Sequence, residues 1–305
     1  MSYAIGIDVG GTSIKSALIA PDGTVGLTHG APTPRGVDAL MTELATQIAW
    51  FEARAAEQDL DLNGRVAFVV PGIVDETKGV GVLSANLGWR DVPMQAKAVE
   101  YLGRPLAFGH DVRAGALAES RLGGHGDSLI YVAIGTGVAS VLVLDGTPLV
   151  SGGWAGEIGQ TLVTCPDTGD QIALEQITSA AAITRRYLAT APSDAVTGID
   201  PATFGSREVF ERAAQGDQVA ADVIDTALDY LAQCFAQLVC VLGPLPIVIG
   251  GGLSGAGEAL LVPLWEKIAA LLALSPMPVI SAARLGSNAQ VIGAGLLAHG
   301  LGDGK

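Results

Sequence analysis

A chain of 305 residues with a hydrophobic fraction of 49% and 41 glycines can form one or two domains with a sizeable core. This composition is typical of a tightly turned α/β protein rather than of a disordered one. The net charge of −14 argues against nucleic acid and anionic membrane surfaces as partners. It leaves ATP open, because glycine-loop N–H groups and Mg²⁺ neutralise phosphates locally.

The first segment of the chain is an apolar strand that ends in a glycine turn and continues into a second strand. Gly10 and Gly11 have no β-carbon, so a phosphate can approach the backbone N–H groups of this turn closely. Thr12 adds a hydroxyl donor, Lys15 adds a cation, and Asp8 is placed to hold Mg²⁺ directly or through water. The alternative is an ordinary β-hairpin with a Gly-Gly turn. The combination with aspartate, threonine and lysine favours a phosphate site.

The chain repeats this pattern about halfway along, at residues 129–149. There an apolar strand again meets a glycine turn, made by Gly135, Thr136 and Gly137, and a second strand, an Asp-Gly turn and a third strand follow. The first copy has its own Asp-Gly turn in the corresponding place. A recurring unit of this kind predicts two structurally similar lobes. Their two glycine turns would hold a polyphosphate between them.

Strands and helices alternate along the rest of the chain. After the first three strands, hydrophobic spacing predicts helices over 37–57, 91–102 and 113–122 and strands over 66–70 and 105–108. After three more strands over 128–150, it predicts helices over 174–188, 207–214, 217–242, 258–274 and 289–299 and strands over 247–250 and 279–282. Such alternation predicts a mainly parallel sheet with both faces covered, a ligand at the strand ends, and a cleft between two lobes that share a hinge.

The repeat also predicts where the two lobes divide. Residues 1–112 together with 288–305 are expected to form an N-terminal lobe, which carries the first phosphate turn. Residues 113–287 are expected to form a C-terminal lobe, which carries the second.

Neither a membrane span nor a disulfide framework is predicted. The apolar run at residues 234–253 contains two prolines and four glycines, so it predicts a helix end, a turn and a buried strand. The three cysteines are too few for a disulfide scaffold. No basic-then-apolar leader precedes the first strand, and we therefore expect a cytoplasmic protein.

The first candidate for catalysis is Asp111, at the junction of a predicted strand and a predicted helix. Its carboxylate can serve as a general base on a substrate hydroxyl, or it can cap the helix. The neighbouring His110 is either a strand-end histidine satisfied by local backbone or a hydrogen-bonding group for a substrate hydroxyl.

Three further loops carry candidate binding groups. Glu157 lies among glycines, which favours a carboxylate that binds two vicinal hydroxyls, as on a sugar, over a core residue. The amide of Asn86 can bond hydroxyls or stabilise an Asx turn. Gly251 and Gly252 follow a buried strand and either let a flat base or ribose approach the backbone or form a tight strand-to-helix turn.

Seven motifs occur together in this chain: Asp8 through Lys15, Pro71-Gly72, Asn86-Leu87-Gly88-Trp89, His110-Asp111 with Ala118-Glu119, Gly135-Thr136-Gly137, Ala155 through Gly159, and Gly250-Gly251-Gly252. In this order they resemble the ROK family (repressor, open reading frame, kinase), and most closely its bacterial glucokinases. The resemblance covers essentially the whole chain. It implies the actin-like ATPase (ribonuclease H-like) fold and an ATP- and Mg²⁺-dependent kinase that phosphorylates the 6-hydroxyl of a hexose, with glucose the first candidate.

The resemblance also implies alternatives and partners. Another hexose or an N-acetylated hexosamine, such as mannose, fructose, N-acetylglucosamine or N-acetylmannosamine, is an alternative substrate, and a non-catalytic sugar- or nucleotide-sensing protein is an alternative function. A homodimer is usual in the family. The DNA-binding helix-turn-helix of the family's repressors has no counterpart ahead of the first strand, so we expect no nucleic-acid partner.

Family roles carry over to matching positions. Asp111 would be the catalytic base, and Asp8 would hold Mg²⁺. Sugar hydroxyls would be bound by Asn86, Glu157 and Glu175, phosphates by Gly10, Gly11, Thr12, Lys15, Gly135, Thr136 and Gly137, and adenosine by Gly251 and Gly252.

The chain departs from the family pattern at three places. His110 stands where the family has asparagine, and Gln160 stands where the Gly-Glu-Ile-Gly-His loop ends in histidine; both are candidate sugar contacts. Cys165 is the one survivor of a three-cysteine cluster that binds zinc together with that histidine. A closed zinc site takes four cysteine or histidine ligands, so we expect no zinc here.

Overall fold

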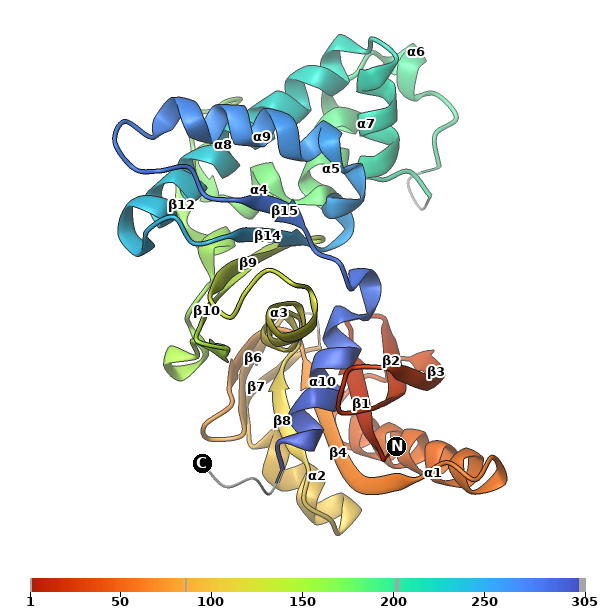
Figure 1. Cartoon of the computed structure of the whole chain (residues 1–305). Helices are drawn as coiled ribbons and strands as arrows, with labels where there is room; N and C mark the ends of the chain where they lie inside the picture. Colours follow the sequence, from red (N-terminus) through yellow and green to blue (C-terminus); the bar gives the residue numbers. More distant parts are fainter. Residues whose placement is uncertain (1, 86, 201–202, 302–305) are drawn as a thin grey trace. The chain divides into compact units, whose positions relative to one another are not determined.

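The computed structural model of the chain describes residues 2–85, 87–200 and 203–301, which divide into two compact units (Figure 1). The first unit comprises Met1–Asp127, Val143–Ala155 and Leu285–Lys305, and the second comprises Ser128–Leu142 and Gly156–Arg284. The chain therefore enters the second unit twice and returns each time to the first.

A five-stranded sheet forms the centre of the first unit, in the order β3 (Val25–Pro32), β2 (Ser13–Ile19), β1 (Tyr3–Val9), β4 (Leu62–Val70) and β8 (Ala107–His110). β1 pairs antiparallel with β2 and parallel with β4, and β8 is parallel to β4. The carboxyl ends of β1, β4 and β8 therefore meet at one edge, which is where ligands of such sheets bind. Asp8 and His110 lie at this edge.

Helices cover both faces of this sheet, because its central strands are apolar on both sides. α1 (Val37–Glu57) and α2 (Met94–Leu102) pack on one face, and α3 (Asp111–Leu122) and α10 (Ala289–His299) pack on the other (Figure 1). α10 crosses β1 at Gly6, where an added β-carbon would lie 2.6 Å from the carbonyl oxygen of Val291. Glycine at this position therefore permits the close contact of the last helix with the first strand.

The second five-stranded sheet has the order β11 (Thr147–Pro148), β10 (Val138–Leu144), β9 (Leu129–Ile134), β14 (Ile247–Gly250) and β15 (Ile280–Ala282). β14 is parallel to both of its neighbours. Counted along the chain, each large sheet has its third, second, first, fourth and fifth strands in this order. The predicted duplication is therefore confirmed.

Six helices belong to the second unit: α4 (Glu175–Thr178), α5 (Ala180–Thr190), α6 (Ser193–Val196), α7 (Ser206–Ala214), α8 (Gln218–Leu242) and α9 (Glu258–Leu271). α8 buries apolar side chains every three or four residues, including Leu228, Leu231 and Phe235, in one core with β9 and β14. Among the helices of the described residues, none is long and apolar enough to cross a membrane.

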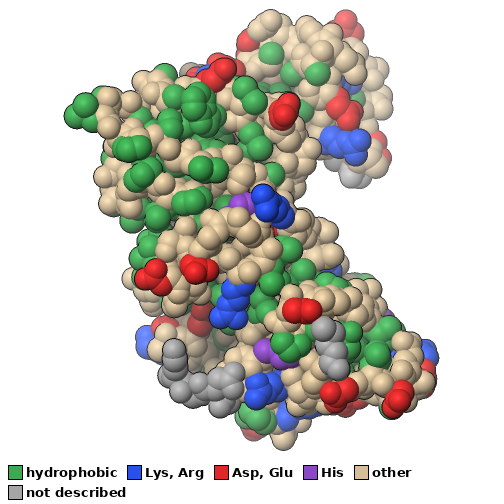
Figure 2. Space-filling model, in the orientation of Figure 1, with side chains coloured by type: hydrophobic (Ala, Val, Ile, Leu, Met, Phe, Trp, Pro, Cys, Tyr) green, Lys and Arg blue, Asp and Glu red, His purple; other side chains and the backbone are tan. Residues whose placement is uncertain are grey.

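α9 has apolar side chains on more than its core face. Leu260, Leu264 and Ile268 recur every fourth residue and are fully buried. Val262 and Trp265 lie on the same helix but are 51% and 46% exposed. Figure 2 shows hydrophobic side chains gathered over this part of the second unit. The core therefore accounts for only part of the apolar sequence of α9.

Two small antiparallel sheets were not predicted: β5 (Ile73–Asp75), β6 (Val80–Ser84) and β7 (Trp89–Val92) form one, and β12 (Leu162–Thr164) and β13 (Gln171–Ala173) form the other. Strands of three to five residues give too short a pattern to recognise. Short 3₁₀ helices span Ser151–Gly153, Ile158–Gln160, Gly252–Ala256 and Gly286–Asn288.

Two predictions require correction. The single helix predicted over 174–188 is two helices, because Ser179 is extended and its side chain caps α5 by accepting a hydrogen bond from the Ala182 amide. The predicted lobe boundary at residue 112 assigned α3 to the wrong compact unit. α3 packs so closely on α10 that a β-carbon at Gly293 would lie 2.0 Å from the carbonyl oxygen of Ala114. By contrast, the predicted bounds of α1 are those observed.

Candidate active site

The first glycine turn joins β1 to β2 and is held by backbone and hydroxyl bonds. The Gly10 amide donates to the carbonyl of Ser13 at 3.0 Å, and the Thr33 hydroxyl donates to the carbonyl of Gly10 at 2.7 Å. Gly11 and Thr12 are exposed, which leaves this part of the turn accessible to a ligand. The predicted phosphate turn is thus a rigid loop with an open face.

Lys15 lies opposite Asp8 in the pairing of β1 with β2, and its side chain is at the surface. Its ammonium group donates a hydrogen bond to the carbonyl of Ser287 at 3.3 Å. The structure therefore places the predicted cation of the turn directly across from the predicted magnesium ligand.

Asp8 and Asp111 form a pair of carboxylates at the edge of the first sheet. Burial raises the pKa of Asp8 to about 6, with the charge of Lys15 opposing the shift. Burial and the negative charge of Asp8 raise the pKa of Asp111 to about 7, although the Val112 amide and the charge of Arg113 oppose the shift. Two carboxylates that disfavour each other's ionisation fit a site for a divalent cation, because a cation would stabilise both charges.

His110 caps α3, so the alternative that Asp111 is the N-cap is wrong. The Arg113 amide donates to Nδ1 of His110 at 3.3 Å, and Asp111 is the first residue of the helix. The Asp111 carboxylate accepts from the next amide, that of Val112, at 2.7 Å. Asp111 is therefore not committed to the cap, and its side chain is 21% exposed.

The His110 ring is buried and neutral. Its pKa is lowered to about 3, mainly by burial and then by the charge of Arg113, while a hydrogen bond with the Gly72 backbone opposes the shift. With Nδ1 accepting from Arg113, the neutral ring carries its hydrogen on Nε2, which lies 3.4 Å from Oδ1 of Asp111. The backbone of Arg113 and that of Gly72 thus both contact the ring, and a role in sugar binding stays a prediction.

In the second unit, Glu175 joins the second glycine turn to Gln160. Its carboxylate accepts from the Gln160 amide at 2.8 Å and from the Val138 backbone amide at 3.2 Å. A β-carbon at Gly137 would lie 2.7 Å from the same carboxylate, so glycine is needed for this approach. The turn also supports α5, since the Gly135 carbonyl accepts from the Ala180 amide at 2.9 Å. The structure therefore brings together three of the predicted site positions in this unit.

Glu157 lies directly after Gly156, a position that no other residue type can occupy. Gly156 has a φ of 93°, and a β-carbon there would lie 1.8 Å from the carbonyl oxygen of Ser140. The Gly156 carbonyl accepts from both the amide and the hydroxyl of Ser140, at 2.7 and 3.1 Å. This anchor ties the backbone just before Glu157 to β10, ahead of the 3₁₀ turn that carries Gln160. Asn86 lies outside the described residues.

A cavity of about 650 Å³ opens beside the second glycine turn. Gly251 has a φ of 78°, and a β-carbon there would lie 2.5 Å from the Ile134 carbonyl oxygen, whereas the space around Gly252 is open. A second cavity of about 520 Å³ shares Gly252 and Ser206 with the first. The first cavity is lined mainly by the second turn and by residues on or beside α5 and α7, among them Gly135, Thr136, Thr184, Arg185, Phe204 and Ser206.

Both cavities are large enough for a nucleotide, and their lining includes residues that were not predicted. Among the described residues that line the larger cavity, Arg185 is the cation and none is a carboxylate. This charge balance suits an anionic ligand. A glycine before a helix, such as Gly205 before α7, is a weak sign in the sequence of a backbone that a ligand can approach. Nothing in the sequence around Arg185 distinguishes it from a surface arginine.

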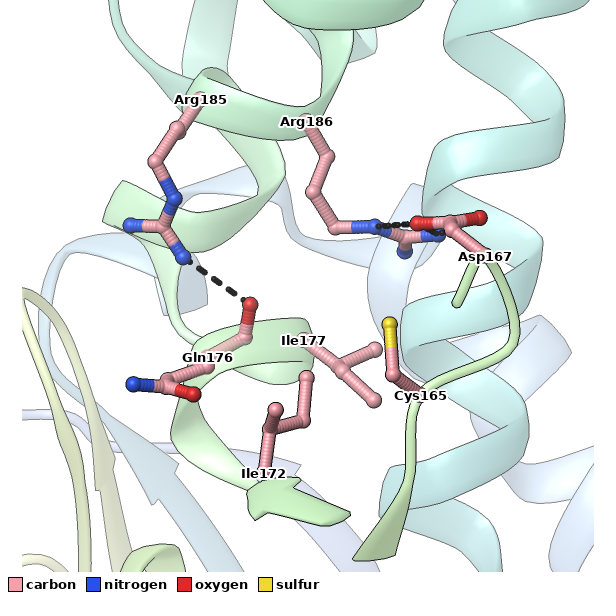
Figure 3. Close-up of a pocket in the computed structure, with 7 residues that line it drawn as sticks. All are labelled: Cys165, Asp167, Ile172, Gln176, Ile177, Arg185 and Arg186. Carbon is pink, nitrogen blue, oxygen red and sulfur yellow. Dashed lines mark hydrogen bonds and ion pairs between the residues drawn. The ribbon is translucent and has the colours of Figure 1, made fainter. Parts of the chain in front are cut away.

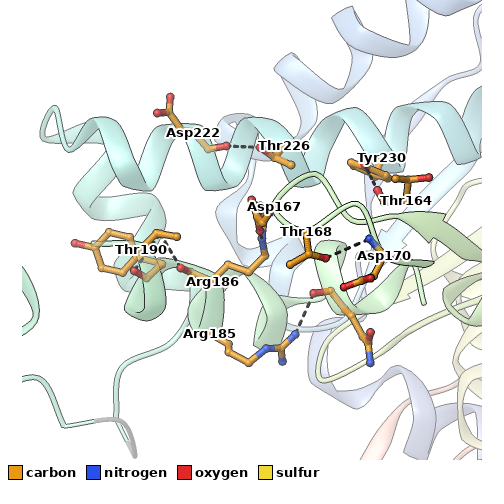
Figure 4. Close-up of polar contacts among 12 residues, drawn as sticks. Thr164, Asp167, Thr168, Asp170, Arg185, Arg186, Thr190, Asp222, Thr226 and Tyr230 are labelled. Atoms are coloured by element: carbon orange, nitrogen blue, oxygen red, sulfur yellow. Dashed lines mark hydrogen bonds and ion pairs between the residues drawn. The ribbon is translucent and has the colours of Figure 1, made fainter. Parts of the chain in front are cut away.

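The loop at residues 161–174, where the family has its cysteine cluster, is fixed by polar contacts (Figures 3 and 4). The Arg186 guanidinium pairs with the Asp167 carboxylate at 3.1 Å, and the Tyr230 hydroxyl donates to the Thr164 carbonyl. The Cys165 amide donates to the Asp170 carbonyl at 2.7 Å. Below the ion pair, Cys165 and Ile177 line a cavity of about 370 Å³. An ion pair and a hairpin therefore organise this loop, and the expected absence of zinc stays a prediction.

Comparison with known proteins gives one family and close relatives over nearly the full length. The model of the ROK family matches residues 4–300. A glucokinase from Halalkalibacterium halodurans is 32% identical over 316 residues, which cover 97% of this chain and 94% of the relative. An N-acetylmannosamine kinase from Salmonella heidelberg is 29% identical and covers 97% and 98% of the two chains.

Among solved structures, a ROK family glucokinase from Streptomyces griseus in complex with glucose and AMPPNP matches with a TM-score of 0.78. It is 26% identical, and the match covers 98% of this chain and 100% of that one. The predicted fold is thereby confirmed.

Proposed function

This chain belongs to the ROK family and has its actin-like ATPase fold, and from that premise we propose that it is an ATP-dependent kinase that phosphorylates the 6-hydroxyl of a hexose. The observation that carries the proposal is the carboxylate pair at the edge of the first sheet. Asp111 has a pKa raised to about 7 and is not used as a helix cap. A base with a pKa near the working pH is the kind that accepts a proton from an attacking hydroxyl.

Phosphoryl transfer depends mostly on positioning and on electrostatic stabilisation, and we propose that different residues of this chain supply each of these. Asp111 would accept the proton of the 6-hydroxyl as that oxygen attacks the γ-phosphorus in line, while the bond from this phosphorus to the β–γ bridging oxygen breaks and ADP leaves. The glycine turns bind phosphates through their amides, and Lys15 adds positive charge. Asp8 would hold Mg²⁺, which when bound neutralises charge on the phosphates. Glu157 and Glu175 are proposed to bind sugar hydroxyls.

The nucleotide is proposed to bind in the cavity beside Gly252. The cavity volume supports this placement, and so does the absence of carboxylates among the residues of its lining that the structure describes. The open space at Gly252 would let a base or ribose approach the backbone. A relative of the same family was solved with AMPPNP, which supports ATP as the donor. Gly251 would then act by shaping the turn.

Glucose is the first candidate substrate, and an N-acetylated hexosamine is the second. Glucokinases and N-acetylmannosamine kinases are both similar to this chain over nearly its full length. Gln160 donates its amide to Glu175 at 2.8 Å, so the carboxylate that would bind the sugar is already oriented by a neutral group. This favours a substrate whose hydroxyls donate ordinary hydrogen bonds to that carboxylate. We further propose a cytoplasmic homodimer, as expected from the sequence.

A coupled assay of ADP release tests the proposal. The panel contains glucose, mannose, fructose, N-acetylglucosamine and N-acetylmannosamine, each with ATP and Mg²⁺. We expect sugar-dependent release of ADP, with glucose among the best substrates, and a 6-phosphate as the product by NMR. ADP release that no sugar stimulates, in a protein that still binds ATP, would contradict the kinase and favour a sensing protein.

A further inference from the structure

Glu76 reaches from the end of β5 to the segment that carries the proposed base. Its Oε1 atom accepts a hydrogen bond from the backbone amide of His110 at 2.7 Å and a second from Nε of Arg113 at 3.0 Å. These partners are 34 and 37 residues away in the sequence. Glu76 therefore holds the residues on both sides of Asp111.

Arg113 is the second half of this arrangement. Its side chain is 3% exposed, and besides the bond to Glu76 its Nη2 atom donates to the carbonyl of Val74. Its backbone amide donates to the His110 ring. A guanidinium this deeply buried needs a charged partner, and Glu76 supplies the carboxylate. Val74 and Glu76 belong to one segment, so Arg113 fastens α3 to the end of β5 by two separate contacts.

The surrounding backbone makes room for this contact. A β-carbon at Gly109 would lie 3.3 Å from the same oxygen of Glu76, which is tighter than ordinary packing. The Glu76 carboxylate thus lies at the junction between β8 and α3. Glu76 is linked to Asp111 through the neighbouring residues His110 and Arg113. The pair therefore acts on the backbone from which the Asp111 side chain projects.

We propose that Glu76 and Arg113 form a positioning pair that fixes the direction of the Asp111 carboxylate for proton transfer. Neither residue is among those proposed above to bind the sugar or the nucleotide. The proposal rests on the proposed function, since Asp111 is the base only if the protein is a kinase. Because proton transfer requires near-attack geometry, a small rotation at the start of α3 lowers turnover while leaving ATP binding in the other unit intact.

The test uses Glu76→Gln, which keeps the size of the side chain and removes its charge. Arg113→Lys keeps the charge but cannot span Glu76 and the Val74 carbonyl at once. The matched control is Glu52→Gln, which breaks another glutamate–arginine pair of the first unit, that of Glu52 with Arg104 at 2.6 Å. For Glu76→Gln we expect kcat to fall about 10- to 100-fold with the KM for ATP unchanged. The kcat of Arg113→Lys should lie between those of Glu76→Gln and the wild type, and the kcat of Glu52→Gln should equal that of the wild type.

Hydrogen exchange over residues 110–113 measures the anchoring without reference to turnover. Faster exchange in Glu76→Gln than in Glu52→Gln, together with the selective loss of kcat, supports the positioning pair. Unchanged exchange overturns it, and so does faster exchange with unchanged kcat, which would leave the pair a structural role only. If the wild type phosphorylates no sugar, the proposed function fails, and unaltered exchange in the variant would show separately that the anchoring is also wrong.

Discussion

Replacing Asp111 by asparagine should abolish most activity and at the same time stabilise the metal-free protein at alkaline pH. The carboxylate is buried beside Asp8, and both effects raise its pKa. A buried acid whose folded-state pKa is raised disfavours the folded state once it ionises. Asparagine keeps the acceptor for the Val112 amide but carries no charge, so it resembles the protonated acid at every pH.

The magnitude follows from the pKa values. The folded-state pKa of Asp111 is about 7 and its ordinary value is 3.8. One pKa unit corresponds to about 1.4 kcal/mol, so the full difference sets an upper limit of roughly 4 kcal/mol. Between these two pKa values the folded state holds more protons than the unfolded state, so stability falls as pH rises through this window. Solvent access to the carboxylate reduces the effect, and we expect Asp111→Asn to gain about 1–3 kcal/mol at pH 8.

Urea unfolding of metal-free wild type and variant at pH 5 and pH 8 measures this difference. The gain should be large at pH 8 and small at pH 5. Asp75→Asn is a control of opposite sign, because hydrogen bonding to Lys78 lowers the pKa of Asp75 and its contribution is present only above the ordinary pKa. That variant should lose stability at pH 8. Equal gains for Asp111→Asn at both pH values, or no gain at pH 8, would refute the reasoning.

The same Asp111→Asn variant should lose about 10²–10⁴ in kcat while still binding ATP, and near-normal turnover would remove Asp111 from the role of base. His110→Asn keeps a good helix cap, so we expect normal stability but altered KM ratios between glucose and N-acetylmannosamine; equal ratios would assign the ring to capping alone. Asp167→Asn breaks the ion pair with Arg186 and should raise the KM for sugar but not for ATP, with a stability change below about 1 kcal/mol because the carboxylate is half exposed. Elemental analysis should find no stoichiometric zinc, and zinc that resists a chelator would contradict the expected loss of that site.

The parts of the site that were predicted from the sequence are those whose chemistry is local. A strand, a glycine turn and a second strand are adjacent in the chain, so the glycine turns at Gly10 and Gly135 could be predicted from the pattern of residues, while their binding of phosphate stays a prediction. The bounds of α1 follow from its own apolar spacing, with Leu40, Leu44 and Ile48 all buried. In each case the physical cause lies within one segment.

The parts that were missed depend on residues far apart in the chain. Glu76 meets His110 across 34 positions, and nothing near Glu76 in the sequence indicates such a partner. Arg186 meets Asp167 across 19 positions, where the loss of cysteines gave a reason to expect a different anchor but did not identify it. Ser179 divides α4 from α5 because a serine can cap a new helix as readily as it sits within one. Pairs of residues this far apart in the chain can be identified only once the fold is known.

The two sheets share one topology, yet they have diverged at the residue two positions before the first glycine of each turn. Asp8 of β1 pairs with Val69 of β4 at the last paired position, and Ala133 of β9 pairs with Gly250 of β14 at the equivalent place. The second copy therefore has a methyl group where the first has a carboxylate. Since a carboxylate beside a phosphate is unfavourable unless a cation lies between them, the proposed metal would be needed beside the first turn, where Asp8 lies. In the proposed reaction the first unit thus handles the cation and the proton, and the second unit binds the donor through its glycine turn and the cavity that Arg185 lines.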